Sequence, residues 1–167
     1  ILVSVQNGRQ HLIAYQPDFN IIKSFRVDYL SNIKIEEPTP RFDELREELD
    51  NMKSKMWGVS TRRKRYGQEI LEHVEFVVKV ADNEEHIVRR LEREKRIGQV
   101  EKIDNNTYRF TADVYDTSEM IPWIRTFIGR IESIGYSDKL SENRFNMDLQ
   151  DMYRIYGIGE EEKDDIQ

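Results

Sequence analysis

A regular alternation of apolar and polar residues constrains the fold of this chain more than any other stretch. Between positions 73 and 80, a mostly polar set alternates with four apolar residues, Val74, Phe76, Val78 and Val80. Because successive side chains of a strand point to opposite faces, this pattern predicts a strand with one strongly apolar face. Such a strand needs helices or a second sheet to cover that face.

The residues on either side of this strand predict the rest of one domain. A helix capped by Asp82 or Asn83 should follow it, and a second helix should begin at Thr117 or Ser118. Further strands are expected at residues 100–103, 108–115 and 131–136. The resulting order β, α, β, β, α, β predicts the ferredoxin-like arrangement, a four-stranded sheet covered by two helices.

The beginning of the chain predicts antiparallel β structure. Asn7-Gly8 separates apolar runs at residues 2–5 and 10–15, and this dipeptide tolerates the positive φ of a tight hairpin turn. A returning strand at 21–30 follows a second turn, with a short tail at 33–35. So few strands bury little area, and we therefore expect strands upstream of Ile1 to complete this sheet.

Pro38 and Pro40 break this pattern and mark a domain boundary. An amphipathic helix at 42–57 should follow and end at Gly58, and another is expected at 140–156. The chain is thus predicted to be α+β in four parts: β strands at 1–38, a linker helix with a basic loop at 39–69, the ferredoxin-like domain with its C-terminal helix at 70–157, and an acidic tail at 158–167.

Composition argues against several classes of protein. The chain has no cysteine, which removes thiolate nucleophiles and Cys-ligated zinc, and its three histidines lie at no spacing typical of metal ligands. Phosphate-binding loops and the G-x-S-x-G elbow are also missing from the sequence. We predict no catalytic residues, no metal and no cofactor. Without an apolar run of about 20 residues, we expect a cytoplasmic protein with no membrane partner.

Candidate ligand-binding residues gather on two neighbouring strands. His11 and Tyr15 share one side of the first strand, and Ser24 and Arg26 share one side of the returning strand. If these sides coincide, Arg26 supplies a planar fork for phosphate or carboxylate, His11 a titratable donor and Tyr15 a stacking face. In the alternative, Arg26 pairs with Asp28 or another acid, and Tyr15 belongs to the core.

A basic run is the second candidate site. Its members are Arg62, Arg63, Lys64 and Arg65. Four adjacent cations could bind a nucleic-acid backbone, and such binding would weaken steeply with salt. The alternative is a solvated loop without a ligand. The formal net charge of −6 argues against phosphate binding over the whole surface but allows a local basic patch.

Two segments, GRQHLIAY and KSFRVDYL, resemble the WYL domain of bacterial transcription regulators. The matching residues are Gly8, Arg9, Leu12, Ile13, Ala14, Tyr15, Ser24, Phe25, Arg26, Val27 and Asp28. The family's Trp, Tyr and Arg are replaced by Gln10, His11 and Tyr29. The downstream half resembles the WCX extension that follows WYL domains, in the segments VEFVVKV, IVRRLEREKRIG, FTADVYD and EMIPWIRTFIGRIESI.

The resemblance implies a partial Sm- or SH3-like β-barrel at residues 1–38 and a WCX domain at residues 70–157. It also implies an effector pocket for single-stranded DNA or a nucleotide, with Arg26 as its best-matched residue and Tyr15, Ser24 and His11 beside it. Homodimers are implied, together with promoter DNA bound through a helix-turn-helix upstream. We therefore expect an effector-sensing and dimerisation region of a DNA-binding transcriptional regulator. The alternatives are a structural dimerisation or protein-interaction module without a ligand, and a regulatory domain for a small metabolite.

Overall fold

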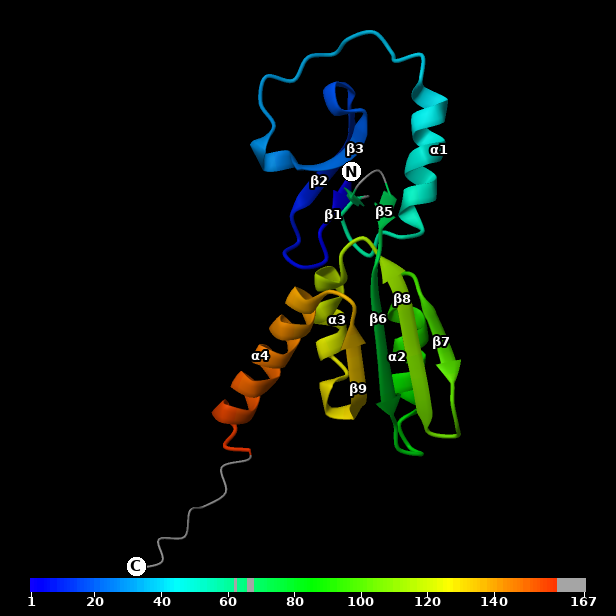
Figure 1. Ribbon diagram of the computed structural model, residues 1–167, viewed down its shortest axis with the longest axis vertical. Helices are drawn as coiled ribbons and strands as arrows, with labels where there is room; N and C mark the ends of the chain where they lie inside the picture. Colours follow the sequence, from blue (N-terminus) through cyan, green and yellow to red (C-terminus); the bar gives the residue numbers. More distant parts are fainter. Residues whose placement is uncertain (62, 66–67, 159–167) are drawn as a thin grey trace, which may run out of the picture.

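A computed structural model describes residues 1–61, 63–65 and 68–158, and for 63–65 it describes the backbone alone. Within this part the chain is α+β, as predicted, with antiparallel sheets of three, two and four strands and four α-helices (Figure 1). The three-stranded sheet stays open, so the described residues do not close a barrel. None of the helices in this part is long and apolar enough to cross a membrane.

The first half of the chain holds two small sheets and one long helix. Strands β1, β2 and β3 form one sheet, and β4 pairs with β5 in the other. Helix α1 lies between the two sheets in sequence. Their bounds are β1 Leu2–Val3, β2 Gln10–Gln16, β3 Ile21–Arg26, α1 Phe42–Lys53, β4 Arg63–Arg65 and β5 Gln68–Ile70.

The predicted hairpin between β1 and β2 is present. Gly8 adopts a φ of 69° at its turn, and its backbone N–H donates to the carbonyl of Ser4 over 2.9 Å. The returning strand is shorter than predicted, because the chain turns into a 3-10 helix at Val27–Tyr29. The backbone N–H of Leu30 donates to Val27 there, which takes these residues out of the sheet. The tail expected at 33–35 does not extend the sheet, since this segment has no strand partner.

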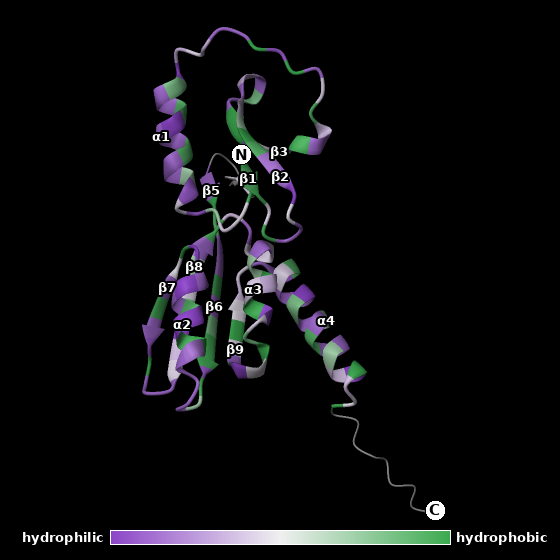
Figure 2. Cartoon of the chain, turned by 180° about the vertical axis from the view of Figure 1, so that it is seen from behind, coloured by the Kyte–Doolittle hydropathy of each residue, from purple (hydrophilic) through white to green (hydrophobic). Residues whose placement is uncertain are grey.

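The second half has the predicted order of strands and helices. Its elements are β6 Glu72–Lys79, α2 Glu85–Glu94, β7 Gln99–Lys102, β8 Thr107–Val114, α3 Ile121–Arg125, β9 Ile131–Tyr136 and α4 Lys139–Ile155. The strand order is β7-β8-β6-β9, which places β6 in the interior of the sheet. Figure 2 shows β6 as a largely hydrophobic strand.

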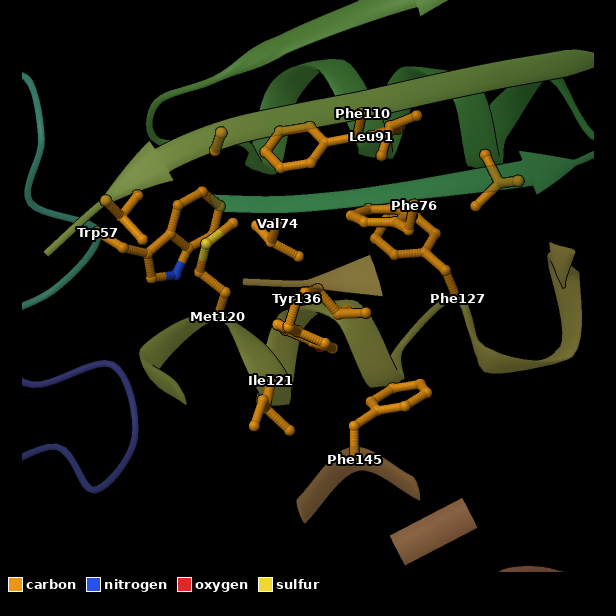
Figure 3. Packing of buried hydrophobic residues seen from close by; sticks show 14 of the residues in the cluster. Trp57, Val74, Phe76, Leu91, Phe110, Met120, Ile121, Phe127, Tyr136 and Phe145 are labelled. Carbon is orange, nitrogen blue, oxygen red and sulfur yellow. The ribbon is translucent and has the colours of Figure 1, made fainter. Parts of the chain in front are cut away.

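One face of this sheet carries the main core. Val74, Phe76 and Val78 of β6 pack with Leu91 of α2 and Ile124 of α3, all fully buried. Phe76 lies 5.1 Å from Phe110 and 6.3 Å from Phe127 between ring centroids (Figure 3). The opposite face is polar, where Arg109 forms ion pairs with Glu75 and Glu101. The alternation in β6 therefore corresponds to a covered face and a solvated face.

Several predicted boundaries are wrong by one or more residues. Glu84 is the N-cap of α2, and Asp116 is the N-cap of the 3-10 helix Thr117–Met120 that leads into α3, so each cap lies one position away from the expected pair. The Asp116 carboxylate accepts from the N–H of Ser118 over 3.0 Å. Helix α1 ends at Lys53 and not at 57, because Met56 and Trp57 leave the helix axis to become buried. The stretch predicted as a basic loop contains strand β4, so its backbone pairs with β5.

Candidate functional site

The register between β2 and β3 decides whether the four candidate ligand-binding residues share a face. His11 lies opposite Arg26, and Ile13 lies opposite Ser24. Two residues directly opposite each other in an antiparallel pair project from the same face of the sheet. Every second residue along each strand projects from that same face. His11, Ser24, Arg26 and Tyr15 therefore lie on one face of the sheet, which is the condition the sequence left open.

His11 and Ser24 contact each other on this face. The His11 Nδ1 and the Ser24 Oγ are 2.8 Å apart, and the imidazole tautomer decides which of the two atoms donates. Arg26 is the residue directly across from His11. Three of the four candidates thus form a compact polar cluster near the end of β3.

The Arg26 guanidinium already has partners within the chain. Its Nε donates to the Asp28 carboxylate over 3.0 Å, a second contact joins Nη2 to the same carboxylate, and its carbon lies 4.0 Å from the centroid of the Tyr29 ring. The hydrogen bond to Asp28 raises the pKa of Arg26, and that to Arg26 lowers the pKa of Asp28. The Arg26–Asp28 pair, which the sequence suggested as the alternative to a ligand contact, is therefore present. Because the Asp28 side chain is 54% exposed, solvent screens the pair strongly.

Tyr15 lies apart from this cluster, four residues beyond His11 and so roughly 13 Å along the strand. Its hydroxyl donates to the Asn20 Oδ1 over 2.8 Å and accepts from the Arg41 Nη1 over 2.8 Å. The Arg41 guanidinium also lies 5.2 Å from the centroid of the Tyr15 ring and forms an ion pair with Glu44. Sequence reasoning missed Arg41, whose only signal was a cation directly after Pro40 at the start of a helix.

A groove of about 410 Å³ lies beside this face, between β2, β3 and α1. Its apolar lining comes from both sides, with Ile13 and Ile22 on the sheet and Leu45 and Leu49 on the helix. Charged residues of α1 stand at the same groove, namely Arg46, Asp50 and Lys53. An apolar or aromatic group of a ligand could lie here while its charged end reaches the polar cluster.

A buried carboxylate joins the two halves of the chain. Glu119 accepts hydrogen bonds from the backbone N–H groups of Gly58, Val59 and Ser60, at 3.0, 2.9 and 3.2 Å. Burial raises the pKa of Glu119, against the opposing effect of these donors. A Cβ at Gly58 would come within 2.7 Å of the carboxylate, so a larger residue here would require the Glu119 side chain to shift away from its donors. With three donors already bound, the carboxylate holds the linker in place.

The side chains of the basic run lie outside the part of the chain that the structure describes. Arg62 is outside the described residues, and Arg63, Lys64 and Arg65 are described as strand β4 without their side chains. Nucleic-acid contact by this run stays a prediction. Within the described part of the chain, no group of three or more histidine, aspartate or glutamate side chains could hold a metal ion.

Comparison with known proteins adds no relative to this picture. The sequence matches none of the models of known protein families, and a search of curated proteins gave no match either. Any likeness to a family therefore depends on the motif residues of β2 and β3 and on the element order of the second half.

Proposed function

We propose that this chain is the effector-sensing and dimerisation region of a DNA-binding transcriptional regulator of the WYL type. The observation that carries the proposal is the register that gathers His11, Ser24 and Arg26 on one face of β2 and β3. Residues 1–38 are then part of an Sm- or SH3-like barrel, and 70–157 are a ferredoxin-like WCX domain. Promoter DNA is bound by a helix-turn-helix upstream, and the regulator acts in the cytoplasm.

The ligand is a nucleic-acid strand or a nucleotide-like anion. Its phosphate takes the place of the Asp28 carboxylate on Arg26, because a guanidinium fork binds phosphate in the same bidentate way. This exchange is feasible since the Arg26–Asp28 pair is exposed and screened by solvent. The Ser24 hydroxyl and the His11 imidazole stand next to the bound phosphate as further polar contacts.

The length of the site favours an oligonucleotide over a single nucleotide. His11 and Tyr15 are roughly 13 Å apart along β2, which is several times the spacing of about 3.4 Å between neighbouring phosphate charges along one strand of stacked DNA, so the site can contact more than one nucleotide. Tyr15 offers an aromatic face for a base, and the neighbouring groove offers apolar walls. Ligand binding regulates the protein only as far as its affinity differs between the DNA-binding and the non-binding state.

Replacing Arg26 with alanine is expected to weaken oligonucleotide binding about tenfold or more, because a charge-assisted bidentate contact is lost. The measurement is a fluorescence anisotropy titration of a labelled single-stranded oligonucleotide with the full chain, at about 50 mM and about 200 mM salt. Arg89→Ala is the matched control, since Arg89 is an exposed arginine of α2 paired with Glu85. Equal affinity of the Arg26→Ala variant and wild type would refute the site.

The alternative is a dimerisation or protein-interaction module without a ligand, favoured by the way Asp28 and Tyr29 already occupy Arg26. Asp28→Asn separates the two functions. If Asp28 competes with a ligand phosphate, this variant binds the oligonucleotide more tightly than wild type. If Arg26 only stabilises the fold, the variant shows no gain in binding at either salt concentration.

A further inference from the structure

Helix α4 carries a row of side chains that the rest of the described chain leaves uncovered. The row runs along one side of the helix at spacings of three and four residues, through Leu140, Arg144, Met147, Asp151 and Ile155. Leu140, Met147 and Ile155 are 79%, 64% and 74% exposed. The helix projects from the body of the molecule (Figures 1 and 2). Apolar residues gathered on one exposed side of a helix mark an interaction surface.

The other side of α4 is already used within the chain. Ser141 and Phe145 are buried there, and Leu149 packs against the main core. Phe145 lies 6.2 Å from Tyr136 of β9 between ring centroids (Figure 3). The exposed row is therefore a second face of α4 and not the side that attaches the helix to its sheet.

A hollow lies at the C-terminal end of the row. This groove of about 410 Å³ lies between α4 and the end of the α3 region. Its apolar lining comes from Ile128, Met152, Ile155 and Tyr156. At the N-terminal end of the row, Leu140 is 79% exposed beside a smaller hollow of about 220 Å³, whose other lining residues are polar or charged. One end of α4 thus presents an apolar side chain, and the other presents an apolar groove.

We propose that this row binds a second copy of this chain, with the two α4 helices antiparallel about a two-fold axis near Met147 and Asp148. In such an interface, each contact between two positions occurs twice. This pairing brings Leu140 to the partner's Ile155, at the groove, and Arg144 to the partner's Asp151. Met147 meets its own counterpart near the axis.

The charges of the row select this arrangement. In the antiparallel pairing, Arg144 of each copy lies against Asp151 of the other copy. A parallel pairing in register would instead place arginine against arginine and aspartate against aspartate. Arg144 makes no ion pair with any residue that the structure describes. Among the same residues, Asp151 pairs with the exposed Arg154, at 2.9 Å. Across an interface, such charge complementarity fixes register and excludes other pairings.

The size of the surface sets the expected strength of the dimer. Helix α4 has 17 residues and so spans about 25 Å. A row of this length, even with a groove at each end, lies near the lower limit of about 1,000 Å² for a specific interface. We therefore expect a reversible dimer whose population depends on protein concentration. This inference rests on the dimerisation part of the proposed function and is independent of the ligand site.

Charge exchange between Arg144 and Asp151 tests the interface. The dissociation constant of the dimer is measured by sedimentation equilibrium of the full chain and its variants. Arg144→Asp and Asp151→Arg should each weaken association at least about tenfold, because each places like charges together twice. The variant with both substitutions should return close to wild-type affinity. The two single variants change the net charge of the chain in opposite directions. Weaker dimerisation of both variants therefore excludes an effect of net charge alone.

Asn146→Asp is the control on the same helix, since Asn146 is exposed but lies outside the row, and it should dimerise as wild type does. A chain that stays monomeric at all concentrations, or single variants that dimerise like wild type, would overturn the proposal. So would a double variant that fails to recover. The oligonucleotide titration of Arg144→Asp keeps the two proposals apart, because binding that still depends on Arg26 supports the ligand site whatever the dimer does.

Discussion

Trp57→Ala is expected to lower the free energy of unfolding by about 3–5 kcal/mol, the loss typical of a buried large aromatic residue. Trp57 comes from the linker, yet it is buried in the core of the second half, beside Met120 (Figure 3). Its ring lies 6.4 Å from Phe110 and 4.9 Å from Trp123 between centroids. Removing it leaves a cavity among side chains of the four-stranded sheet and α3.

Urea unfolding followed by circular dichroism measures this loss. Phe42→Ala is the matched control, because Phe42 belongs to the same linker but is 59% exposed. That control should change stability by no more than about 0.5 kcal/mol. A loss below about 1 kcal/mol in Trp57→Ala would mean that the linker is not fixed to the second half in solution.

Glu119→Ala should be destabilising to a similar extent, by about 3 kcal/mol or more. The substitution leaves the N–H groups of Gly58, Val59 and Ser60 without their acceptor, and each unsatisfied buried group costs about 1–3 kcal/mol. Glu119→Gln retains one acceptor oxygen and should lose less. Denaturant unfolding of both variants measures the difference.

A double substitution tests whether Gly58 and Glu119 act together. Gly58→Ala alone should destabilise, because its Cβ would meet the carboxylate at 2.7 Å. In a chain that already carries Glu119→Ala, the new Cβ has no carboxylate to contact. There Gly58→Ala should lower the free energy of unfolding much less. Additive losses in this cycle would contradict the contact, since independent sites add and contacting residues do not.

The pH dependence of stability gives a further measurement on Glu119. Burial raises the pKa of Glu119 above its ordinary value of 4.5, so the folded chain binds this proton more tightly than the unfolded chain. The resulting stabilisation is present at low pH and is lost as the pH rises through the raised pKa. The difference in stability between wild type and Glu119→Gln should therefore be larger near about pH 4.5 than near about pH 7.

Sequence patterns predicted the local features of this fold well. The alternation around Phe76 and the helix periodicity around Leu91 gave the element order of the second half, because both report which side chains face a core. The hairpin at Gly8 followed from the backbone freedom of one residue. Boundaries were less accurate, since Trp57 leaves the expected helix for a tertiary contact that no local pattern encodes.

The site was only partly predictable, for a related reason. Periodicity placed His11 and Tyr15 on one side of a strand, but the register with Arg26 depends on turn geometry that the sequence left open. Arg41 reaches Tyr15 across 26 positions of the chain, and Glu119 reaches Gly58 across 61. Contacts at such separations follow from the packed fold and leave no spacing signal in the sequence.

The measurement that tests the central claim most directly is a map of backbone amide shifts in the isotope-labelled full chain during titration with a short single-stranded oligonucleotide. We expect the largest shifts on His11, Ser24 and Arg26, with further shifts along β2 toward Tyr15. Shifts that occur elsewhere while β2 and β3 stay unchanged, or no shifts at saturating oligonucleotide, would contradict that claim.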